Sequence, residues 1–443
     1  MASMVPMMSQ VKKLRAGGGA VNEFVFAWER EDGCCFRYVL PIPAGREHDP
    51  ATQRLAERAV KFALWAAGGW RLHLAGPEAV CQAVEAAYSK GGARDFDRDM
   101  MFKAYGCEME IRRCRPEEVP ASKDSVRGAG ISWKGCRIGF DLGASDFKIA
   151  AVQEGKVTFS DEFPWDPRNA ADPQYHVDKL NEGLRAAAAH LPRVDAIGGS
   201  TAGIVVDNQI RVASLLRAVP ADRYAEAQSM FRTIEKQWNV PVKVENDGDV
   251  TALAAYVTGG TTAVLGVAMG SSQAGGYLDR SGHITGRLNE LAFTPVDFAP
   301  DAPADEWSGD VGVGAMYFSQ QATNYLAGKL GIPFPEDMKL PERLLEVQRL
   351  MAAEDARAIR LYTLVGEHLG HSVPWYREFY DYDNLLMLGR VTSGRGGEII
   401  LATARETVRK HYPECAMVNI FMPDEKAKRL GQAVAAAALS AQP

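Results

Sequence analysis

Residues 138–152 read Ile-Gly-Phe-Asp-Leu-Gly-Ala-Ser-Asp-Phe-Lys-Ile-Ala-Ala-Val and form the most informative part of the chain. The pattern predicts an apolar strand that ends at Asp141, a turn of small residues, and a second strand after Lys148. A carboxylate at a strand end can hold Mg²⁺, usually through water. The backbone N–H groups of Gly143 and Ser145 could close on a phosphate, to which Lys148 would add positive charge. An ordinary β-hairpin is the alternative, because short motifs give false positives.

A second informative segment covers residues 242–256. Its alternating pattern predicts a strand that ends at Glu245-Asn246-Asp247, and an Ala-rich helix follows from about Asp249. Asp247 would then lie at a strand-to-helix corner, where a carboxylate can accept a proton from a substrate hydroxyl as general base. The alternative is that Asn246, Asp247 and Asp249 only cap the helix, a role that suits these residue types.

Two Gly-rich turns follow further buried strands. Residues 263–277 run from an apolar strand into Gly270-Ser271-Ser272, a turn small enough for close approach of a phosphate. Residues 384–397 run into Gly389-Arg390-Val391-Thr392-Ser393-Gly394, where a turn before a helix leaves room for a nucleotide base or ribose. The alternatives are a plain hairpin for the first turn and an ordinary strand-to-helix turn with a helix cap for the second.

The order of these four segments resembles the two-lobed actin-like ATPase (ribonuclease H-like) fold, and within it the ROK family of repressors, open reading frames and sugar kinases. The resemblance covers about two thirds of the chain, from Cys136 onward, and includes residues 197–207, 288–293 and 431–439. It implies an α/β fold with a first lobe at 131–258 and a second lobe with a helical insert at 259–443. Residues 1–130 would form an additional small α/β domain with its linker.

The resemblance also implies a function: ATP-dependent phosphorylation of a sugar hydroxyl, with Mg²⁺. Asp247 would be the general base, and Asn246, Glu290 and Gly203 would lie at the substrate. Asp141 would orient Mg²⁺ through water. The residues implied in nucleotide or phosphate binding are Asp141, Gly143, Ser145, Lys148, Gly270, Ser271, Ser272, Gly389 and Gly394.

The chain departs from the family pattern on the sugar side. Where sugar kinases of the family carry Glu-x-Gly-His, Glu290 remains but Ala292 and Phe293 replace the Gly and His. No cysteine lies between Cys136 and Cys415, so we expect no structural zinc. We therefore predict that the residues lining the sugar pocket differ from those of the family's sugar kinases. Two alternatives stay open: a non-catalytic sugar- or nucleotide-binding regulator, and a kinase or ATPase of this fold with a non-sugar acceptor.

Composition limits the possible partners. The 443 residues carry a net charge of −6, which argues against nucleic acid or a membrane surface as a general partner. Seven cysteines without a Cys-x-x-Cys pair indicate reduced thiols, and the start lacks the apolar core of a secretory signal. We therefore expect a cytoplasmic protein with a small-molecule substrate, and family likeness suggests a homodimer.

Residues 1–130 open with strands and are nearly balanced in charge, unlike a helix-turn-helix domain. Farther along, residues 326–369 are expected to be mostly helical with a break at 331–341. An aromatic cluster at 375–382 is expected in the core or a dimer contact. The elements predicted in the N-terminal region are a mobile tail at 1–19, strands at 24–30 and 35–42, a helix at 51–67, a strand at 70–75, a helix at 77–89, a strand at 109–114 and a linker at 115–130.

Overall fold

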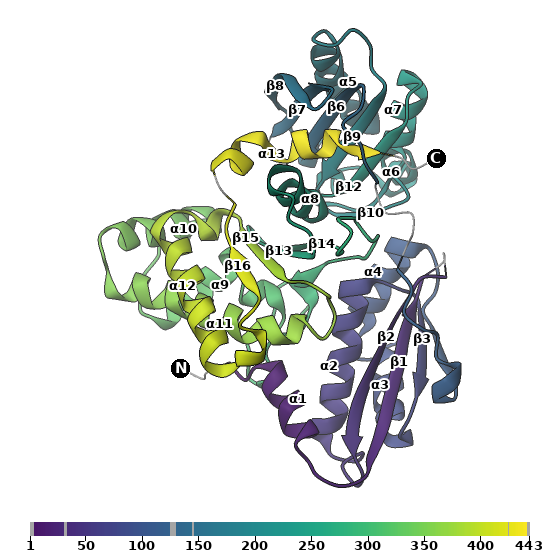
Figure 1. The fold of residues 1–443 in the computed structure, drawn as a ribbon, viewed down its shortest axis with the longest axis vertical. Coiled ribbons are helices and arrows are strands. Elements are labelled where there is room, and N and C mark those ends of the chain that lie inside the picture. Colours follow the sequence, from purple (N-terminus) through teal and green to yellow (C-terminus); the bar gives the residue numbers. More distant parts are fainter. Residues whose placement is uncertain (1–3, 31–32, 125–129, 144–145, 424, 441–443) are drawn as a thin grey trace.

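Three sheets organise the molecule in this computed structural model, which describes residues 4–30, 33–124, 130–143, 146–423 and 425–440. Figure 1 shows the sheet of the first lobe at the top, that of the second lobe in the middle, and the N-terminal sheet at the bottom. No helix within the described ranges has both the length and the apolar character needed to cross a bilayer.

The N-terminal module, residues 4–124, contains a four-stranded sheet in the order β2-β1-β3-β4. The first two strands form the predicted antiparallel hairpin, and β4 pairs in parallel with β3. The predicted strands and the helices at 51–67 and 77–89 are confirmed, whereas α4 was not predicted. The elements are α1 (Met7–Arg15), β1 (Val21–Glu29), β2 (Cys35–Pro43), α2 (Pro50–Ala67), β3 (Arg71–Ala75), α3 (Glu78–Tyr88), α4 (Asp95–Tyr105) and β4 (Glu110–Arg113).

The prediction of a mobile tail at 1–19 is wrong for its described part. Residues 7–15 form α1, whose apolar side chains at positions 7, 8, 11 and 14 are buried. This helix packs on α11 (Ala356–Tyr376) of the second lobe. Its apolar spacing is helical, but so short a helix is marginal alone and is stabilised by the surface that it covers.

The first lobe has a five-stranded sheet in the order β12-β9-β6-β7-β8, in which β6, β7 and β8 are antiparallel neighbours and β9 and β12 run parallel to β6. Helices α5 and α7 share an apolar core with one face of this sheet. The elements are β5 (Gly130–Ile131), β6 (Cys136–Leu142), β7 (Asp146–Gln153), β8 (Lys156–Pro164), α5 (Pro173–Ala188), β9 (Ala196–Thr201), β10 (Ile204–Val206), β11 (Gln209–Val212), α6 (Tyr224–Gln228), α7 (Met230–Trp238) and β12 (Val242–Asn246).

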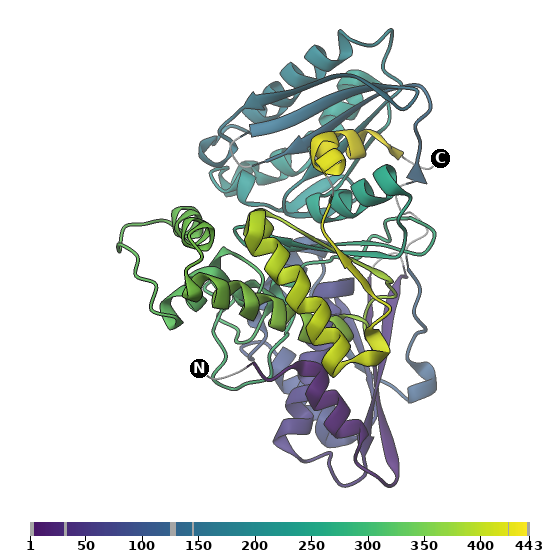
Figure 2. The same ribbon diagram turned by 60° about the vertical axis from the view of Figure 1, so that its left-hand side comes forward.

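The opposite face of this sheet is covered by α13 (Glu425–Ala437), which lies between the sheet and α8 (Asp247–Gly259) (Figures 1 and 2). The contact is close because two strand residues have no side chain. A Cβ added at Gly139 would lie 1.8 Å from the carbonyl oxygen of Ala433, and one at Gly198 would lie 1.7 Å from that of Ala436. The sequence therefore brings an Ala-rich helix onto a Gly-bearing face.

The second lobe has a four-stranded sheet in the order β14-β13-β15-β16, with β13 and β15 parallel and β13 and β14 antiparallel. The predicted helical stretch at 326–369 is confirmed as parts of α9, α10 and α11, with the break between the first two. The elements are β13 (Val264–Met269), β14 (Gln273–Leu278), α9 (Gln320–Lys329), α10 (Leu340–Ala352), α11, β15 (Asn384–Leu388), α12 (Gly394–His411), β16 (Asn419–Phe421) and β17 (Leu439–Ser440), which pairs with β5.

Short 3-10 helices complete the fold. Two of them, η5 and η6, lie in the loop between β14 and α9. They are η1 (Pro116–Glu118), η2 (Pro167–Asn169), η3 (Ser214–Leu216), η4 (Ala221–Arg223), η5 (Leu291–Phe293), η6 (Gly314–Met316), η7 (Arg390–Thr392) and η8 (Pro413–Cys415).

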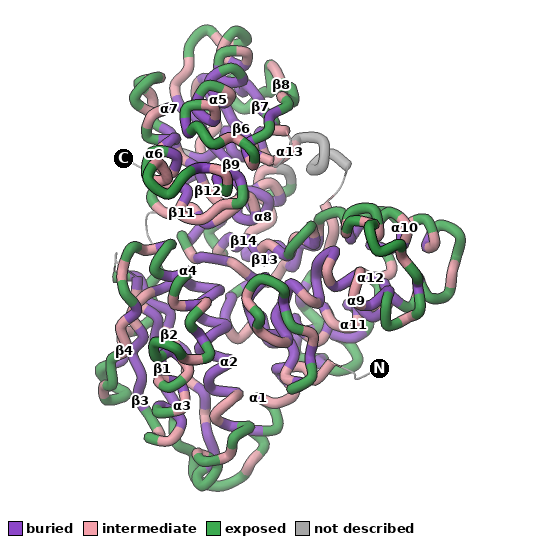
Figure 3. Tube along the Cα trace, turned by 180° about the vertical axis from the view of Figure 1, so that it is seen from behind, coloured by how far each residue is buried: buried purple, intermediate pink, exposed green. Residues whose placement is uncertain are grey.

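The N-terminal module and the second lobe share one continuous apolar core (Figure 3). Phe62 of α2 stacks on Phe379 with ring centroids 4.1 Å apart, and Trp375 meets Phe62 edge-on at 5.4 Å. The aromatic cluster at 375–382 is thus core within one chain, which was one of its two expected roles. Burial of several large rings against the module stabilises this joint strongly.

The division into 1–130, 131–258 and 259–443 stays a prediction, but the structure corrects one consequence of it. That division assigns the last helix to the second lobe, whereas α13 packs on β6 and β9 of the first. The glycines of this face allow the close backbone approach of α13.

Candidate active site

Asp141 lies where β6 ends, opposite Lys148 of β7 in the antiparallel register. The turn between them is fastened by the Gly143 N–H, which donates to the Asp146 carbonyl at 3.0 Å. Burial raises the pKa of Asp141 to about 6, while Ser200 and Lys148 act in the opposite direction. Ser145, predicted to bind phosphate, lies outside the described residues.

Asn246 is the N-cap of α8, so the capping alternative is realised by this residue. Its side-chain oxygen accepts from the Gly248 N–H at 2.7 Å, and its amide nitrogen donates to the Gly203 carbonyl at 2.8 Å. Gly203 has φ +102°, and an added Cβ would lie 2.3 Å from the Val212 carbonyl oxygen. Asn246 therefore fixes the turn after β9, and contact with a substrate stays a prediction for both residues.

Asp247 is the first residue of α8, and its carboxyl interacts electrostatically with the carboxyls of Asp141 and Glu290. Burial, followed by the charge of Asp141, raises the pKa of Asp247 to about 7. Burial, followed by the charge of Asp247, raises the pKa of Glu290 to about 8. Three carboxyls from β6, α8 and the loop before η5 thus share one electrostatic environment and cannot all ionise freely at neutral pH.

Asp249 does not cap the helix, which was the alternative that its sequence position suggested. Its carboxylate is buried and accepts from the Tyr277 N–H at 2.9 Å and from the Asn289 side chain at 2.8 Å. Tyr380 in turn donates to the Asn289 side-chain oxygen at 3.1 Å. Asp249 consequently ties α8 to the segment that carries Glu290. The Asp-x-Asp spacing was visible in the sequence, but nothing in it identified Asn289 as the partner.

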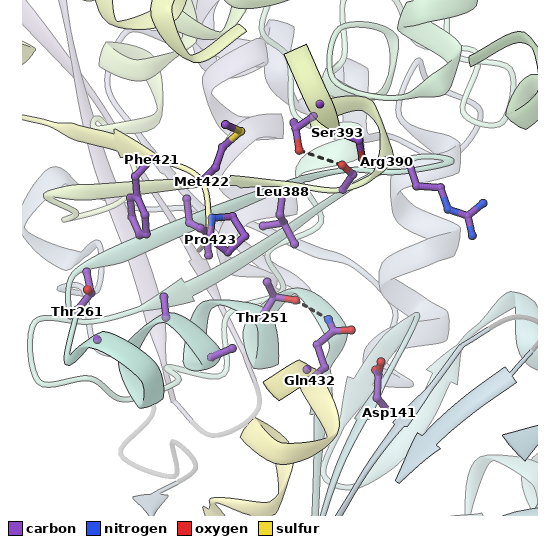
Figure 4. A pocket seen from close by; sticks show the side chains of 18 of the residues that line it. Asp141, Thr251, Thr261, Leu388, Arg390, Ser393, Phe421, Met422, Pro423 and Gln432 are labelled. Atoms are coloured by element: carbon purple, nitrogen blue, oxygen red, sulfur yellow. Dashed lines mark hydrogen bonds between the residues drawn. The ribbon is translucent and has the colours of Figure 1, made fainter. Parts of the chain in front are cut away.

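A cavity of about 850 Å³ lies between the two lobes, bordered by α8, the turn after β15, the end of β16 and α13 (Figure 4). Asp141, Lys148, Gly389 and Gly394, four of the predicted nucleotide-binding residues, line it. The described residues around it are Asp141, Lys148, Thr251, Ala254, Ala255, Gly259, Thr261, Leu386, Leu388, Gly389, Arg390, Thr392, Ser393, Gly394, Glu398, Phe421, Met422, Pro423, Gly431 and Gln432.

The cavity has an apolar side and a polar side. Figure 4 shows Leu388 close to the segment 421–423, and Gln432 on the same side of the cavity as Asp141. Gln432 also donates to the carbonyl of Asp247 at 2.9 Å, which connects the cavity to the candidate base. Sequence reasoning missed Gln432 and the 421–423 segment, because only the folded chain places the end of β16 and the start of α13 beside the Gly389 turn.

The predicted phosphate turn at 270–272 is placed differently. Gly270, Ser271 and Ser272 are not among the residues that line the 850 Å³ cavity. The turn is closed by the Gly270 N–H, which donates to the Ser272 carbonyl, and the Gly270 carbonyl accepts from the Gln320 N–H at 2.9 Å. It is therefore a fastened hairpin, and its contact with phosphate stays a prediction.

Asp141 suits the Mg²⁺ role in one respect. Within the described ranges no cluster of three or more His, Cys, Asp or Glu side chains is arranged to hold a metal ion. Mg²⁺, however, is commonly bound by one or two carboxylates together with substrate phosphates and water. Asp141 borders the same cavity as Lys148. A single carboxylate beside a cation that can bind phosphate fits a Mg²⁺ ion that arrives with a nucleotide.

Comparison with known proteins bears on the fold. A scan of protein-family models found no match, and no curated protein matches the chain. Among solved structures, a ROK hexokinase from Thermus thermophilus has a TM-score of 0.53 and 20% identity, covering 68% of this chain and 97% of that one. A ROK glucokinase from Streptomyces griseus, in complex with glucose and AMPPNP, has a TM-score of 0.50 and 20% identity, with 68% and 98% covered.

A regulator shares the same architecture. A ROK family transcriptional regulator, described as a homologue of the Escherichia coli MLC protein, has a TM-score of 0.54 and 16% identity, covering 68% of this chain and 78% of that one. At these identities the likeness establishes the fold. The chain therefore has the two-lobed α/β fold of the ROK proteins, as the resemblance in its sequence predicted.

Proposed function

We propose that the chain is an ATP-dependent kinase of the ROK type that phosphorylates a hydroxyl of a sugar. The observation that carries the proposal is the position of Asp247. Its backbone is hydrogen-bonded to Gln432 of the nucleotide-sized cavity, and its carboxyl is coupled to Glu290 on the other side. The structures most similar to this chain include a ROK hexokinase and a ROK glucokinase, which supports kinase chemistry at such a cleft.

In the proposed reaction Asp247 takes the proton of the acceptor hydroxyl. The oxygen then forms a bond to the γ-phosphorus of ATP, while the bond from that phosphorus to the ADP oxygen breaks. With a pKa of about 7, Asp247 is partly ionised at neutral pH, where a general base works best. Mg²⁺, when bound, would neutralise charge on the phosphates, and Asp141 would orient it.

Glu290 and Lys148 have supporting roles in this proposal. With a pKa of about 8, Glu290 stays largely protonated at pH 7 and can both donate to and accept from a second acceptor hydroxyl. Lys148 is exposed and lines the cavity, so its ammonium can meet phosphate oxygens. Most of the rate would come from positioning and electrostatics.

The decisive experiment measures ADP release from ATP·Mg²⁺ with a panel of sugars and sugar amines. Wild type is compared with Asp247→Asn and with Asp178→Asn, which removes an exposed carboxylate on α5. We expect acceptor-dependent turnover that falls by roughly 10² to 10⁴ in Asp247→Asn and is unchanged in the control. Full turnover in Asp247→Asn would contradict the role of the base.

A second candidate is a regulator that binds sugar or nucleotide without catalysis. Phe293 favours it, because this residue replaces a polar group of the family's sugar site and its ring packs 4.4 Å from Trp65. The similarity to a ROK transcriptional regulator is consistent with this alternative. Nucleotide binding by calorimetry, with no ADP release for any sugar, would favour the regulator or a non-sugar acceptor over the kinase.

A further inference from the structure

The C-terminal end of α2 in the N-terminal module meets the segment that carries Glu290. The backbone N–H groups of Asn289 and Glu290 donate to the carbonyl oxygens of Ala66 and Trp65, each at 3.0 Å. Carbonyls in the last turn of a helix have no partner within the helix and need one elsewhere. Here the candidate acceptor segment supplies it, so the module fixes the backbone of Glu290 directly.

Arg30 fastens the start of the same segment. Its guanidinium is buried, donates to the Ala67 carbonyl at 3.2 Å, and donates also to the carbonyl of Gly286. Hydrogen bonds from a charged donor are stronger than neutral ones, and a buried guanidinium that loses its acceptors is costly. Arg30 thus joins the module to residue 286 while α2 holds residues 289 and 290.

Aromatic and ionic contacts fix the chain beyond Glu290. The Phe293 ring lies 4.4 Å from Trp65 and 5.4 Å from Phe96, measured between ring centroids. Farther along, the buried Asp310 carboxylate meets cations of the module, with oxygen-to-nitrogen distances of 2.7 Å for Arg58, 2.9 Å for Arg94 and 3.3 Å for Lys61. The whole acceptor-side loop of the second lobe is therefore held by the module.

The module also contacts the first lobe. Helix α4 packs on the β10–β11 hairpin, as the view from behind shows (Figure 3). Ile204 of β10 belongs to the apolar core that the module shares with the second lobe, and Val206 and Val212 pack against it. Ile204 follows Gly203, whose carbonyl is bonded to Asn246, the residue before the candidate base.

The proposed nucleotide cavity is lined by a different part of the chain. All the described residues that line the 850 Å³ cavity lie between positions 141 and 432, so no described residue of the module borders it. A change in the module should consequently leave nucleotide binding intact and act on the acceptor alone. This separation makes the role of the module measurable.

We propose that the N-terminal module is a fixed wall of the acceptor site, in which Arg30 and the end of α2 position Glu290 while α4 holds the β10–β11 hairpin opposite. The proposal rests on the kinase function for its catalytic consequence, but not for its structural one. Arg30 is a positioning residue: it acts on Glu290 through the backbone at 286–290 and does not itself touch the acceptor.

The first test is amide hydrogen exchange on the full chain. Arg30→Ala is compared with Arg15→Ala, a matched control that also joins the module to the second lobe but through Glu378 at 2.6 Å. We expect the rate of amide exchange across 286–293 to rise about 10-fold or more in Arg30→Ala. The reason is that this segment can then open without breaking the hydrogen bond from Arg30 to the Gly286 carbonyl. The control should leave this segment unchanged.

The second test distinguishes an effect on the acceptor site from an effect on nucleotide binding. In Arg30→Ala, kcat/KM for the acceptor should fall roughly 10-fold to 100-fold, since small misplacement of a positioning group has effects of this size. The Kd for AMPPNP, measured by calorimetry, should stay within about two-fold. Arg30→Lys keeps one charged donor and should recover part of the loss. Phe96→Leu, a milder change on α4, provides the same comparison if Arg30→Ala does not fold.

Three outcomes would overturn the proposal. Unchanged exchange at 286–293 in both Arg30→Ala and Phe96→Leu would show that the module does not hold this segment. If Arg30→Ala weakened AMPPNP binding by the same factor as it lowered kcat/KM for the acceptor, the variant would be generally destabilised. If Arg15→Ala lowered kcat/KM for the acceptor as much as Arg30→Ala does, the end of α2 would have no specific role. If wild type shows no acceptor-dependent turnover, the kinase function fails, while the exchange result still decides whether the module positions Glu290.

Discussion

The two sides of the cleft are built in different ways. The candidate nucleotide side is a cavity whose described lining residues lie between positions 141 and 432 and include the Asp141 and Gly389 segments, on which the resemblance to the ROK family rests in part. On the acceptor side, Glu290 is held by backbone hydrogen bonds to Trp65 and Ala66 of a module that precedes the shared fold. The comparison teaches that a separate domain can fix one segment of a two-lobed fold while it leaves the cavity between the lobes to residues of the lobes themselves.

The ionic joint on the acceptor side gives the largest expected effect on stability. Although burial opposes it, the charges of Lys61, Arg58 and Arg94 hold the pKa of Asp310 well below its usual range. Asp310→Ala would remove the carboxylate that Arg58 binds and one of the two carboxylates that Lys61 and Arg94 each bind. We expect it to lower the free energy of unfolding by about 3–5 kcal/mol. Chemical denaturation measures this loss.

The control for this variant is Glu414→Ala, which breaks the exposed ion pair with Lys12. Exposed pairs contribute little, so its effect should stay below about 1 kcal/mol. Nucleotide affinity should survive Asp310→Ala, because the residue lies outside the lining of the cavity. Equal effects from the two variants would mean that the module is not tightly joined to the acceptor loop.

A substitution beneath α13 tests the nucleotide side. Gly198→Ala places a methyl group 1.7 Å from the Ala436 carbonyl oxygen, so the helix must shift. We expect a loss of about 2–4 kcal/mol in the free energy of unfolding and weaker AMPPNP binding, since Gln432 on α13 lines the cavity. Gly18→Ala, which meets nothing within 4 Å, is the matched control. Unchanged nucleotide affinity in a folded Gly198→Ala would separate α13 from the cavity.

The coupled carboxyls between the two sides predict a pH-dependent stability. The pKa of Asp247 is raised to about 7 in the folded state, chiefly by burial, from an ordinary value of 3.8. The folded state therefore binds more protons, and stability falls as pH rises from about 4 through 7. Asp247→Asn removes this effect and should be more stable than wild type at pH 8, by about 1–3 kcal/mol.

Thermal unfolding at pH 5 and pH 8 measures this difference. The advantage of Asp247→Asn should shrink towards pH 5, where the wild-type carboxyl is protonated in the folded protein. The same ionisation predicts that kcat/KM rises with pH through about 7, because the base must lose its proton. A variant that is less stable than wild type at pH 8 would contradict the coupled site.

The smallest expected effect belongs to the rim of the nucleotide cavity. Arg390 is exposed and lines the cavity beside the Gly389 turn. Arg390→Ala should weaken ATP binding by about 3-fold to 10-fold, the size expected for one exposed charge near a phosphate or ribose. The acceptor KM should not change. Arg395→Ala, which breaks an exposed pair with Glu354, is the control. A change in acceptor KM alone would reverse the assignment of the two sides.

Local pattern was sufficient for much of the fold and part of the site. The strand that ends at Asp141, the corner at Asp247 and the turn at Gly389 were all predicted, because alternation and small-residue turns are local properties. The Asp141 and Gly389 segments border one cavity, as their order implied. The same reasoning misjudged residues 7–15 and did not predict α4, because short helices depend on the surfaces that they cover.

The sequence by itself determined the order of the strand, turn and helix segments, since these follow from periodicity and turn chemistry, and the resemblance of that order to the ROK family implied the two-lobed fold. Only the tertiary structure decided that the module at 4–124 joins Asn289 and Glu290, that Asp249 binds Asn289, and that α13 returns to the first sheet. These contacts join residues far apart in the chain. They depend on shape, on helix-end carbonyls and on the close approach of α13 to Gly139 and Gly198, and a local pattern does not specify which distant segment meets these groups.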